Sequence, residues 1–503
     1  MANIFAEKQR NVIPGWRSLK ETGHAGELGG FRRWALSTDS DEHLILRRDW
    51  AERKNLGRAA DILAASVHLL VDQDLVAEAR AEVLRAGDEA PAFIIQLAET
   101  REDDVVRASL QLHAPQDIFS KARTRVQSLR RALSENPRNG ILWCELALEY
   151  SVLGSSNKAG RAMEKAVYLT KHNRYVIRSA ARYFLHVDDE ERSHDLIRKS
   201  DLVKYDPWVG ASEIAIATLR KRQSRFTKHW MDVIRKGGIR STETTELATA
   251  IGTVEWAHGS LKGAKSFLKQ GLMDPNDNSL AQVQWISQQD SSVRLELTDP
   301  SVTVGFSETL AKDAFIGERF DESLAHALDW HRSLPFAERP IFMGTHIASV
   351  FTKEYDKSIE LAKEGLRSNP KSSAMWNNLA YAAALAGNLD EAAHAINMGR
   401  QFMATPRDKA CIEATSGLLA FRRGDTETGR VEYEKAIDIA AEVKEEGLEE
   451  LAKVNMLREQ ARIGIVPIES DSTRWLEEKS MDKNLSVRAI ALEALRLLKR
   501  EVQ

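Results

Sequence analysis

The side chains best placed to do chemistry in this sequence are basic. Between Ile216 and Arg240, eight Lys and Arg residues accompany one acid, Asp232, and Phe226 and Trp230 lie among them. Cationic groups beside aromatic rings can hold an acidic protein segment or the backbone of a nucleic acid. A solvated helix face has the same composition, so all three interpretations stay open. The eight basic residues are Arg220, Lys221, Arg222, Arg225, Lys228, Arg235, Lys236 and Arg240.

Catalytic signatures are missing from the sequence. It contains no His-Glu-x-x-His, Cys-x-x-Cys, Gly-x-Ser-x-Gly or dinucleotide fingerprint. The nearest match to a phosphate-binding loop runs from Gly259 to Ser266, but it lacks the Gly-Lys-Ser end that places backbone amides and a lysine on phosphates. We therefore predict that the protein is not an enzyme and uses no cofactor. An enzyme with an unrecognised site in residues 1–116 stays open as a third alternative.

The sequence predicts no metal site either. Cys144 and Cys411 are the two cysteines, and each falls in a helical apolar pattern, as a buried core thiol does. His326, His331 and His346 lie close together in the sequence, but their spacing places them on separate helices with no converging carboxylate. We expect packed or solvated histidines at these positions.

Composition indicates a folded chain with no dominant charge. The 503 residues are 43% hydrophobic, and 71 Lys and Arg residues nearly cancel 74 Asp and Glu residues. No overall field therefore attracts nucleic acid or an anionic membrane. The longest apolar stretch, from Ala59 to Val71, is interrupted by polar residues and is shorter than the roughly 20 residues of a membrane helix. The first residues contain no apolar run typical of a signal peptide, and we predict a cytoplasmic protein.

A repeat in the sequence predicts the helices that must position these side chains. Large residues, then small residues, then a glycine recur in the same order in two windows. One window contains Trp143, Leu146, Ala147, Tyr150, Gly154, Ala159 and Ala166, and the other contains Trp376, Leu379, Ala380, Tyr381, Gly387, Ala392 and Pro406. Small residues allow two antiparallel helices to cross closely, and a glycine can close the turn between them. This pattern resembles the tetratricopeptide repeat, whose unit has about 34 residues.

Weaker copies extend the resemblance over most of the chain and predict an all-α fold, an α–α superhelix with helical caps. Trp143 and Trp376 are expected in the core of their repeats. The tail from Asp482 resembles one HEAT-type unit, although an amphipathic capping helix explains it equally well. The predicted regions are an N-terminal arm (1–45), a helical region (46–116), a first array (117–290), a linker (291–305), a second array (306–445) and a helical C-terminal cap (446–503).

The resemblance implies a groove, lined by the first helix of each hairpin, that holds a partner protein. Asn378 matches the position at which peptide-binding repeats place an amide, but the equivalent positions of the other repeats carry no second asparagine. We predict a non-catalytic scaffold, adaptor or regulatory subunit, with a nucleic-acid-associated solenoid as the alternative. The candidate partner-binding residues are Arg178, Arg182, Arg220, Arg222, Arg225, Trp230 and Asn378.

The N-terminal arm carries apolar anchors without a helical period. Ile13, Pro14 and Trp16 are examples. Such a segment can fold back to cap the first hairpin or dock on a partner, and the sequence does not separate these alternatives.

Overall fold

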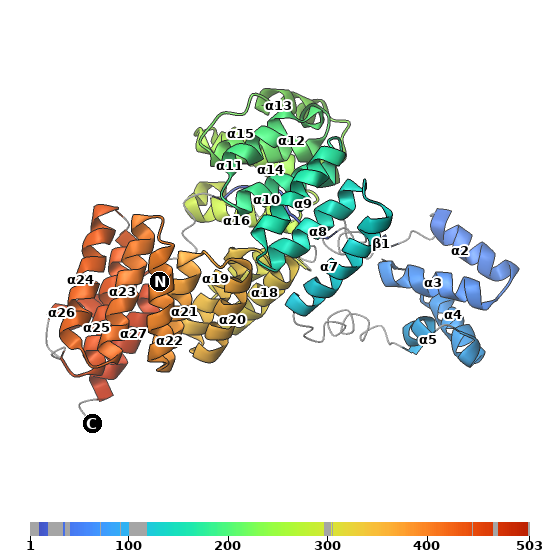
Figure 1. Ribbon diagram of the computed structural model, residues 1–503. Coiled ribbons are helices and arrows are strands. Elements are labelled where there is room, and N and C mark those ends of the chain that lie inside the picture. Colours follow the sequence, from blue (N-terminus) through green and yellow to red (C-terminus); the bar gives the residue numbers. More distant parts are fainter. Residues whose placement is uncertain are drawn as a thin grey trace. The chain divides into compact units, whose positions relative to one another are not determined.

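The computed structural model describes residues 10–18, 34–35, 41–70, 72–90, 92–99, 118–295, 303, 305–444, 446–465 and 471–500. Helices dominate these residues, which confirms the predicted all-α fold (Figure 1). The exception is one parallel pairing between the two-residue strands β1 (Trp34–Ala35) and β2 (Leu69–Leu70). Contacts divide the chain into a small unit, within 28–121, and a large unit that contains residues 10–18 and most of the chain after Ala122.

The small unit has a helical core of its own. Trp50, Ile62, Leu63 and Val83 are buried there, and the Trp50 indole donates a hydrogen bond of 2.9 Å to Glu78 Oε2. Its elements are α2 (Asp41–Glu52), α3 (Leu56–His68), α4 (Gln73–Ala86), η1 (Gly87–Glu89) and α5 (Ala92–Glu99). Residues 100–117, the end of the predicted helical region, lie outside the described residues.

The large unit begins its helical hairpins after α7 (Ile118–Glu135). In the first array α8 (Gly140–Val152) pairs with α9 (Ser156–Leu169), α10 (Arg174–His186) with α11 (Glu190–Lys199), α12 (Pro207–Leu219) with α13 (Thr227–Lys236), and α14 (Ser241–Ala257) with α15 (Leu261–Gly271). Between them lies η2 (Asp201–Lys204), and α16 (Asp277–Gln289) with η3 (Ser291–Val293) ends the array. The predicted first array covered residues 117–290, and most of the predicted linker lies outside the described residues.

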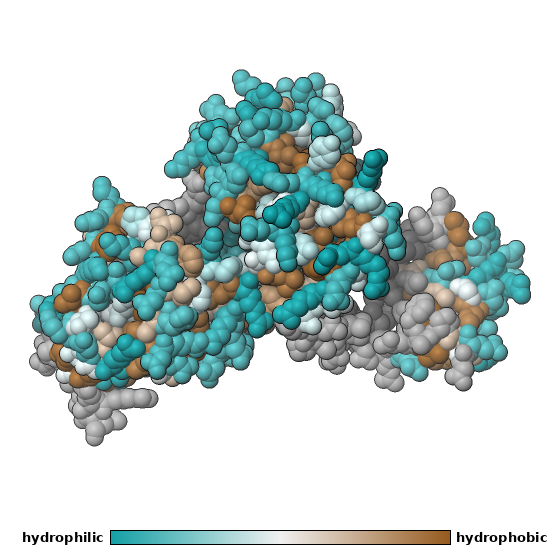
Figure 2. Space-filling view, in the orientation of Figure 1, coloured by the Kyte–Doolittle hydropathy of each residue, from teal (hydrophilic) through white to brown (hydrophobic). Residues whose placement is uncertain are grey.

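The second array continues the same arrangement. Here α17 (Ser307–Ile316) pairs with α18 (Phe320–Ser333), α19 (Glu338–His346) with its extension η5 (Ile347–Phe351) pairs with α20 (Tyr355–Ser368), α21 (Ser373–Ala386) with α22 (Leu389–Gln401), and α23 (Pro406–Arg422) with α24 (Thr426–Glu442). The chain ends in α25 (Glu446–Arg462), α26 (Asp471–Lys479) and α27 (Leu485–Arg500). Hydrophilic side chains cover most of the visible face (Figure 2). The large unit is therefore a solenoid of helical hairpins.

The turn inside each of these hairpins contains one residue in the left-handed conformation. Glycine takes it in four turns, as the repeat pattern predicts, but in the other four a charged residue does so. These residues are Gly154, Gly259, Gly387 and Gly424, and Asp188, Lys221, Glu318 and Lys353. Since this conformation is disfavoured for residues with a Cβ, packing between the helices imposes the turn.

The two signature tryptophans require a correction, because both are only partly buried. The Trp143 indole donates to the carbonyl of Pro137 at 2.9 Å, and the Trp376 indole donates to the carbonyl of Pro370 at 3.0 Å. Each ring lies at the edge of the core, since its polar end binds the turn that precedes its own hairpin. The predicted crossing residues, in contrast, are fully buried at Ala147, Ala159, Ala380 and Ala392.

Gly154 lies where the first hairpin meets the second array. The Ser368 hydroxyl donates to the carbonyl of Val152 at 2.7 Å, and a Cβ at Gly154 would lie 2.2 Å from the carbonyl oxygen of Arg367. A Cβ at Gly387, in contrast, would have no neighbouring atom within 4 Å.

We therefore expect Gly154→Ala to be more destabilising than Gly387→Ala. Both changes place alanine in the left-handed region, at about 1–2 kcal/mol. Gly154→Ala adds overpacking against a backbone carbonyl, about 1–3 kcal/mol more. Urea unfolding of the two variants checks this expectation, and equal losses would contradict the contact with Arg367.

Candidate functional site

Residues 10–18 lie against first helices of the first array and against α17. The backbone N–H of Ile13 donates to the carbonyl of Asn11 at 2.8 Å, which makes a tight turn, and an extended stretch follows from Pro14 to Ser18. Pro14, Trp16 and Ser18 are buried while Gly15 and Arg17 between them are exposed, the alternation of an extended chain with one face covered. The segment contacts α16 and α17 at one end and α8 and α10 at the other. Residues 10–18 of the predicted arm therefore fold back along three hairpins and α16, and not as a cap on the first hairpin.

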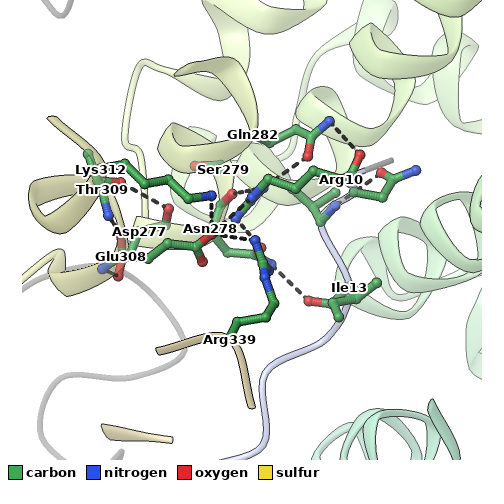
Figure 3. A network of polar contacts seen from close by, with 12 residues as sticks. Arg10, Ile13, Asp277, Asn278, Ser279, Gln282, Glu308, Thr309, Lys312 and Arg339 are labelled. Atoms are coloured by element: carbon green, nitrogen blue, oxygen red, sulfur yellow. Dashed lines mark hydrogen bonds and ion pairs between the residues drawn. The ribbon is translucent and has the colours of Figure 1, made fainter. Parts of the chain in front are cut away.

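Arg10 occupies a pocket of hydrogen-bond acceptors at the start of the segment (Figure 3). Its Nε lies 3.0 Å from Glu308 Oε1, and its Nη1 lies 2.9 Å from Gln282 Oε1 and 3.1 Å from the carbonyl of Asn278. The side chains of Arg10 and Glu308 are 1% and 9% exposed. A planar guanidinium can satisfy several acceptors at once, which explains why this charge tolerates burial.

Glu308 is the anionic centre of this pocket. Besides Arg10, it pairs with Lys312 Nζ at 2.8 Å and with Arg339 Nη2 at 3.0 Å. Burial works to raise the pKa of Glu308, but the three cations outweigh burial and hold this pKa well below its usual value. Glu308 is therefore a carboxylate with more positive than negative charge around it.

Asp277 fixes the position of Glu308. Its carboxylate accepts the backbone N–H groups of Glu308 and Thr309, both at 2.9 Å, in the first turn of α17. These N–H groups have no partner within their own helix, so the carboxylate of α16 ties the two helices together. Burial, and then the charge of Glu308, raise the pKa of Asp277.

Two amides of α16 bind the main chain of the segment. Asn278 Nδ2 donates to the carbonyl of Ile13 at 2.9 Å, and Gln282 Nε2 donates to the carbonyl of Arg10 at 2.9 Å. The two residues are four apart and therefore lie on one face of the helix. Contacts of this kind hold an extended backbone whatever its side chains are.

Aromatic and polar pockets receive the rest of the segment. The Trp16 ring packs against Phe336, with centroids 5.2 Å apart, and edge-on against Tyr183 at 5.8 Å. Ser18 donates to Glu145 Oε2 at 2.5 Å. The Tyr175 hydroxyl lies 3.0 Å from the carbonyl of Arg17 and also contacts Glu145. Side-chain pockets thus select particular residues of the segment.

Arg178 and Arg182 do lie on the first helix of their hairpin, as predicted, but neither is a free cation. Arg178 is buried and pairs with Glu246 at 2.6 Å, with its guanidinium 4.9 Å from the Trp208 ring centroid. Arg182 lies 5.0 Å over the ring of Phe336, which also contacts Trp16. Burial, and then the charge of Arg339, lower the pKa of Arg182 to about 10.

The remaining candidates of the basic stretch differ in accessibility. Trp230, predicted as an anchor for a partner, is 1% exposed and donates to the carbonyl of Val203 at 3.0 Å, so this prediction is corrected to a core position. Arg220 is partly buried, 3.3 Å from His194 Nδ1. Arg222 and Arg225 are exposed. The basic charge of this stretch is therefore on the surface, whereas its tryptophan is not.

Asn378 is buried in the second array and donates to Thr345 Oγ1 at 2.9 Å. The C-terminal helix α27 reaches this array as well: Ser486 Oγ lies 2.8 Å from His346 Nε2, and Arg488 pairs with Glu318 at 2.6 Å. In this arrangement Asn378 contacts its own chain and not an open groove.

The three histidines have separate surroundings. His346 is buried beside Ser486, and burial lowers its pKa to about 3. His331 lies 3.3 Å from Glu364, and His326 lies 3.7 Å from Glu322. Within the part of the chain that the structure describes, no three His, Cys, Asp or Glu side chains form a group that could hold a metal ion.

Sequence reasoning missed the residues that hold the segment. Asn278 and Gln282 lie just after Pro275, where the repeat pattern indicated only the boundary between two hairpins. An amide pair four residues apart on a first helix was the available signal. No signal in the sequence indicated the pairing of Arg10 with Glu308, because the two residues are 298 positions apart.

Comparisons with known proteins give only distant likenesses. No known protein family matches the sequence, and no curated protein matches it. A crystal structure of yeast Tom70 has 13% sequence identity and a TM-score of 0.31, covering 79% of this chain and 96% of its own. The human IFIT1 dimer with m7Gppp-AAAA has 15% identity and a TM-score of 0.35, covering 75% and 94%; with PPP-AAAA it has 14% identity and a TM-score of 0.32, covering 86% and 95%. TM-scores this low do not support a fold assignment. The assignment therefore rests on the helical hairpins of the structure.

Among the described helices, none combines the length and apolar character needed to cross a membrane.

Proposed function

We propose that this protein is a non-catalytic scaffold of the tetratricopeptide type that holds an extended segment of a partner protein. Its groove is the site that residues 10–18 occupy, lined by α8, α10, α16, α17 and Phe336. The observation that carries the proposal is the pair of amides on α16, Asn278 and Gln282, which bind two main-chain carbonyls of an extended segment. Amides that bind carbonyls suit a polypeptide in the way that cations suit phosphates.

The groove also has the means to choose among peptides. The acceptors around Arg10 favour a guanidinium, and the rings of Tyr183 and Phe336 favour an aromatic side chain. Buried aromatic and arginine anchors are the residues that contribute most to protein interfaces. The partner is accordingly a separate chain, and this protein acts as its adaptor or regulatory subunit in the cytoplasm.

Selection from a library of displayed peptides tests the proposal. Because residues 10–18 fill the groove, the bait is the full chain with Arg10→Glu and Trp16→Ala. We expect enriched peptides whose affinity falls at least tenfold when Asn278→Ala and Gln282→Ala are added. The matched control adds Arg222→Glu and Arg225→Glu, which are exposed and should leave this affinity unchanged. If no peptide is enriched, or if enriched peptides ignore the amide changes, the groove is not a peptide site.

The exposed basic stretch supports a second candidate, binding of nucleic acid. Lys221, Arg222, Arg225 and Lys228 are exposed, and none of them takes part in an ion pair within the described residues. Cations without a protein counter-ion are available to phosphates.

For this candidate we expect Arg222→Glu, Arg225→Glu and Lys228→Glu together to abolish binding of a fluorescent single-stranded oligonucleotide. The wild-type affinity should fall steeply as salt rises. Stability should change by less than about 0.5 kcal/mol per residue, because the side chains are exposed. The control reverses three other exposed cations, Arg130, Arg131 and Arg138, and gives the same net charge. Equal affinities of both triple variants would show that only overall charge matters.

A further inference from the structure

We infer that residues 10–18 are a displaceable ligand of the groove, and that the partner displaces them with an extended segment in which an arginine precedes a tryptophan by six residues. This inference rests on the proposed function and adds both its regulation and the chemistry of the partner. Four observations carry this inference. The amides of the groove have second partners within the array, and so do its carboxylates. The segment is connected to the array only through another unit, and the segment places particular side chains in the pockets of the groove.

Each amide that binds the segment has a second partner within the array. Asn278 Nδ2 also donates to Glu246 Oε1 at 3.0 Å, and Gln282 Nε2 also lies 3.3 Å from Thr253 Oγ1. A buried polar group that loses its only partner costs about 1–3 kcal/mol. Departure of the segment leaves both amide NH2 groups with a protein acceptor, so the donors escape this penalty, whereas Gln282 Oε1 and Asn278 Oδ1 exchange Arg10 for water.

The carboxylates that bind the segment also keep other partners when the segment leaves. Glu308 keeps Lys312 and Arg339 when Arg10 leaves, and Glu145 keeps Arg125 at 3.2 Å when Ser18 leaves. The Tyr175 hydroxyl can donate its proton to Glu145 instead of the Arg17 carbonyl. Breaking a buried ion pair is severely destabilising when it strands a charge, and no charge is stranded here. The carboxylates and the amide NH2 groups of the lining thus keep protein partners both with and without the segment.

The segment is attached to the array only through another unit. Residues 19–117 separate Ser18 from α7, and they include the small unit with its own buried core. The hairpins that form the groove follow one another from α8 onward, and residues 10–18 add Val12 to their core. Because the segment belongs to the same chain as the groove, its binding is intramolecular, and it occupies the groove until a better ligand arrives.

The pockets define what that ligand must carry. The guanidinium of Arg10 reaches four acceptors, on Glu308, on Gln282 and on the backbone and side chain of Asn278, which the single ammonium of a lysine matches poorly. Six residues later, Trp16 is 1% exposed between Tyr183 and Phe336. The competing segment is therefore extended, with an arginine and a tryptophan at this spacing.

A labelled peptide with the sequence of residues 10–18 tests the inference in fluorescence anisotropy. The full-length chain with Arg10→Glu and Trp16→Ala should bind it at least tenfold more tightly than the wild-type chain, whose groove is filled. Arg17→Ala is the matched control, because Arg17 is exposed and makes only a 3.4 Å contact to Ser333, so it should bind like the wild type. Peptides with Arg10→Lys or Trp16→Ala should bind the released variant at least tenfold more weakly.

Three results would overturn the inference. The first is a released variant that keeps its helical circular dichroism but does not bind the peptide; if library peptides still bind it, the scaffold function stands alone. The second is a released variant without a cooperative thermal transition, which would make residues 10–18 part of the fold. The third is a wild-type dimer, seen by light scattering, that becomes monomeric in the released variant, because the segment would then fill the groove of a second copy.

Discussion

Glu308→Ala is expected to lower the free energy of unfolding by about 3–5 kcal/mol, as removal of one member of a buried ion pair does. The change leaves Arg10, Lys312 and Arg339 around a site without its negative charge. The control is Glu322→Ala, which removes an exposed partner of Arg319 and should cost far less stability than Glu308→Ala, because exposed ion pairs contribute little. Urea unfolding of both variants measures the difference, and similar losses would contradict the role of Glu308 as the anionic centre.

The lowered pKa of Glu308 also predicts that the free energy of unfolding depends on pH. Its pKa in the folded protein lies well below the ordinary 4.5, so its contribution is fully present above pH 4.5 and is lost as the pH falls toward the folded value. Asp277 beside it has a raised pKa and contributes with the opposite sign. The stability difference between the wild type and Glu308→Gln should therefore shrink as the pH falls below about 4.5. A difference that stays constant over this range would exclude a depressed pKa.

Trp230→Ala is the second change with a large expected effect, again about 3–5 kcal/mol, because a fully buried aromatic ring leaves a cavity. The indole is 1% exposed, and its Nε1 lies only 2.2 Å from the position that a Cβ would take at Gly210. Gly210→Ala should for this reason destabilise the same hairpin.

The matched control for Trp230 is Trp376→Ala, since Trp376 is partly exposed and packs at the edge of its core. We expect a clearly smaller loss there. Because repeats contact mainly their neighbours, hydrogen exchange should rise around α12 and α13 for Trp230→Ala and around α21 for Trp376→Ala. A larger loss at Trp376 than at Trp230 would reverse the assignment of core and edge.

The helical hairpins could be predicted from the sequence because their signals are local. Alanines at 147 and 159, or at 380 and 392, are twelve residues apart and meet where two helices of one hairpin cross. Glycines such as Gly154 and Gly387 close the turns between them through a backbone conformation that only glycine adopts easily. Spacing and residue size within one repeat were enough to assign fold class and repeat phase.

The candidate site could not be predicted in the same way, because its contacts join distant parts of the chain. Arg10 binds residues 268 to 298 positions away, and Arg178 binds Glu246 across 68 positions. A charged residue is expected to be solvent-exposed unless its partner is known. For this reason Arg178 was expected to be a free cation in the groove.

The sequence by itself determined that this protein is a solenoid of helical hairpins, because periodicity and small residues encode neighbouring helices. Only the tertiary structure decided what lies in the groove. An extended segment has no helical period and shows no hydrogen-bond partners of its own in the sequence, so the positions of Ile13 and Trp16 were left undetermined. Amides, carboxylates and aromatic rings from four helices and from the loop that holds Phe336 fix this segment, and they converge only when the hairpins stack.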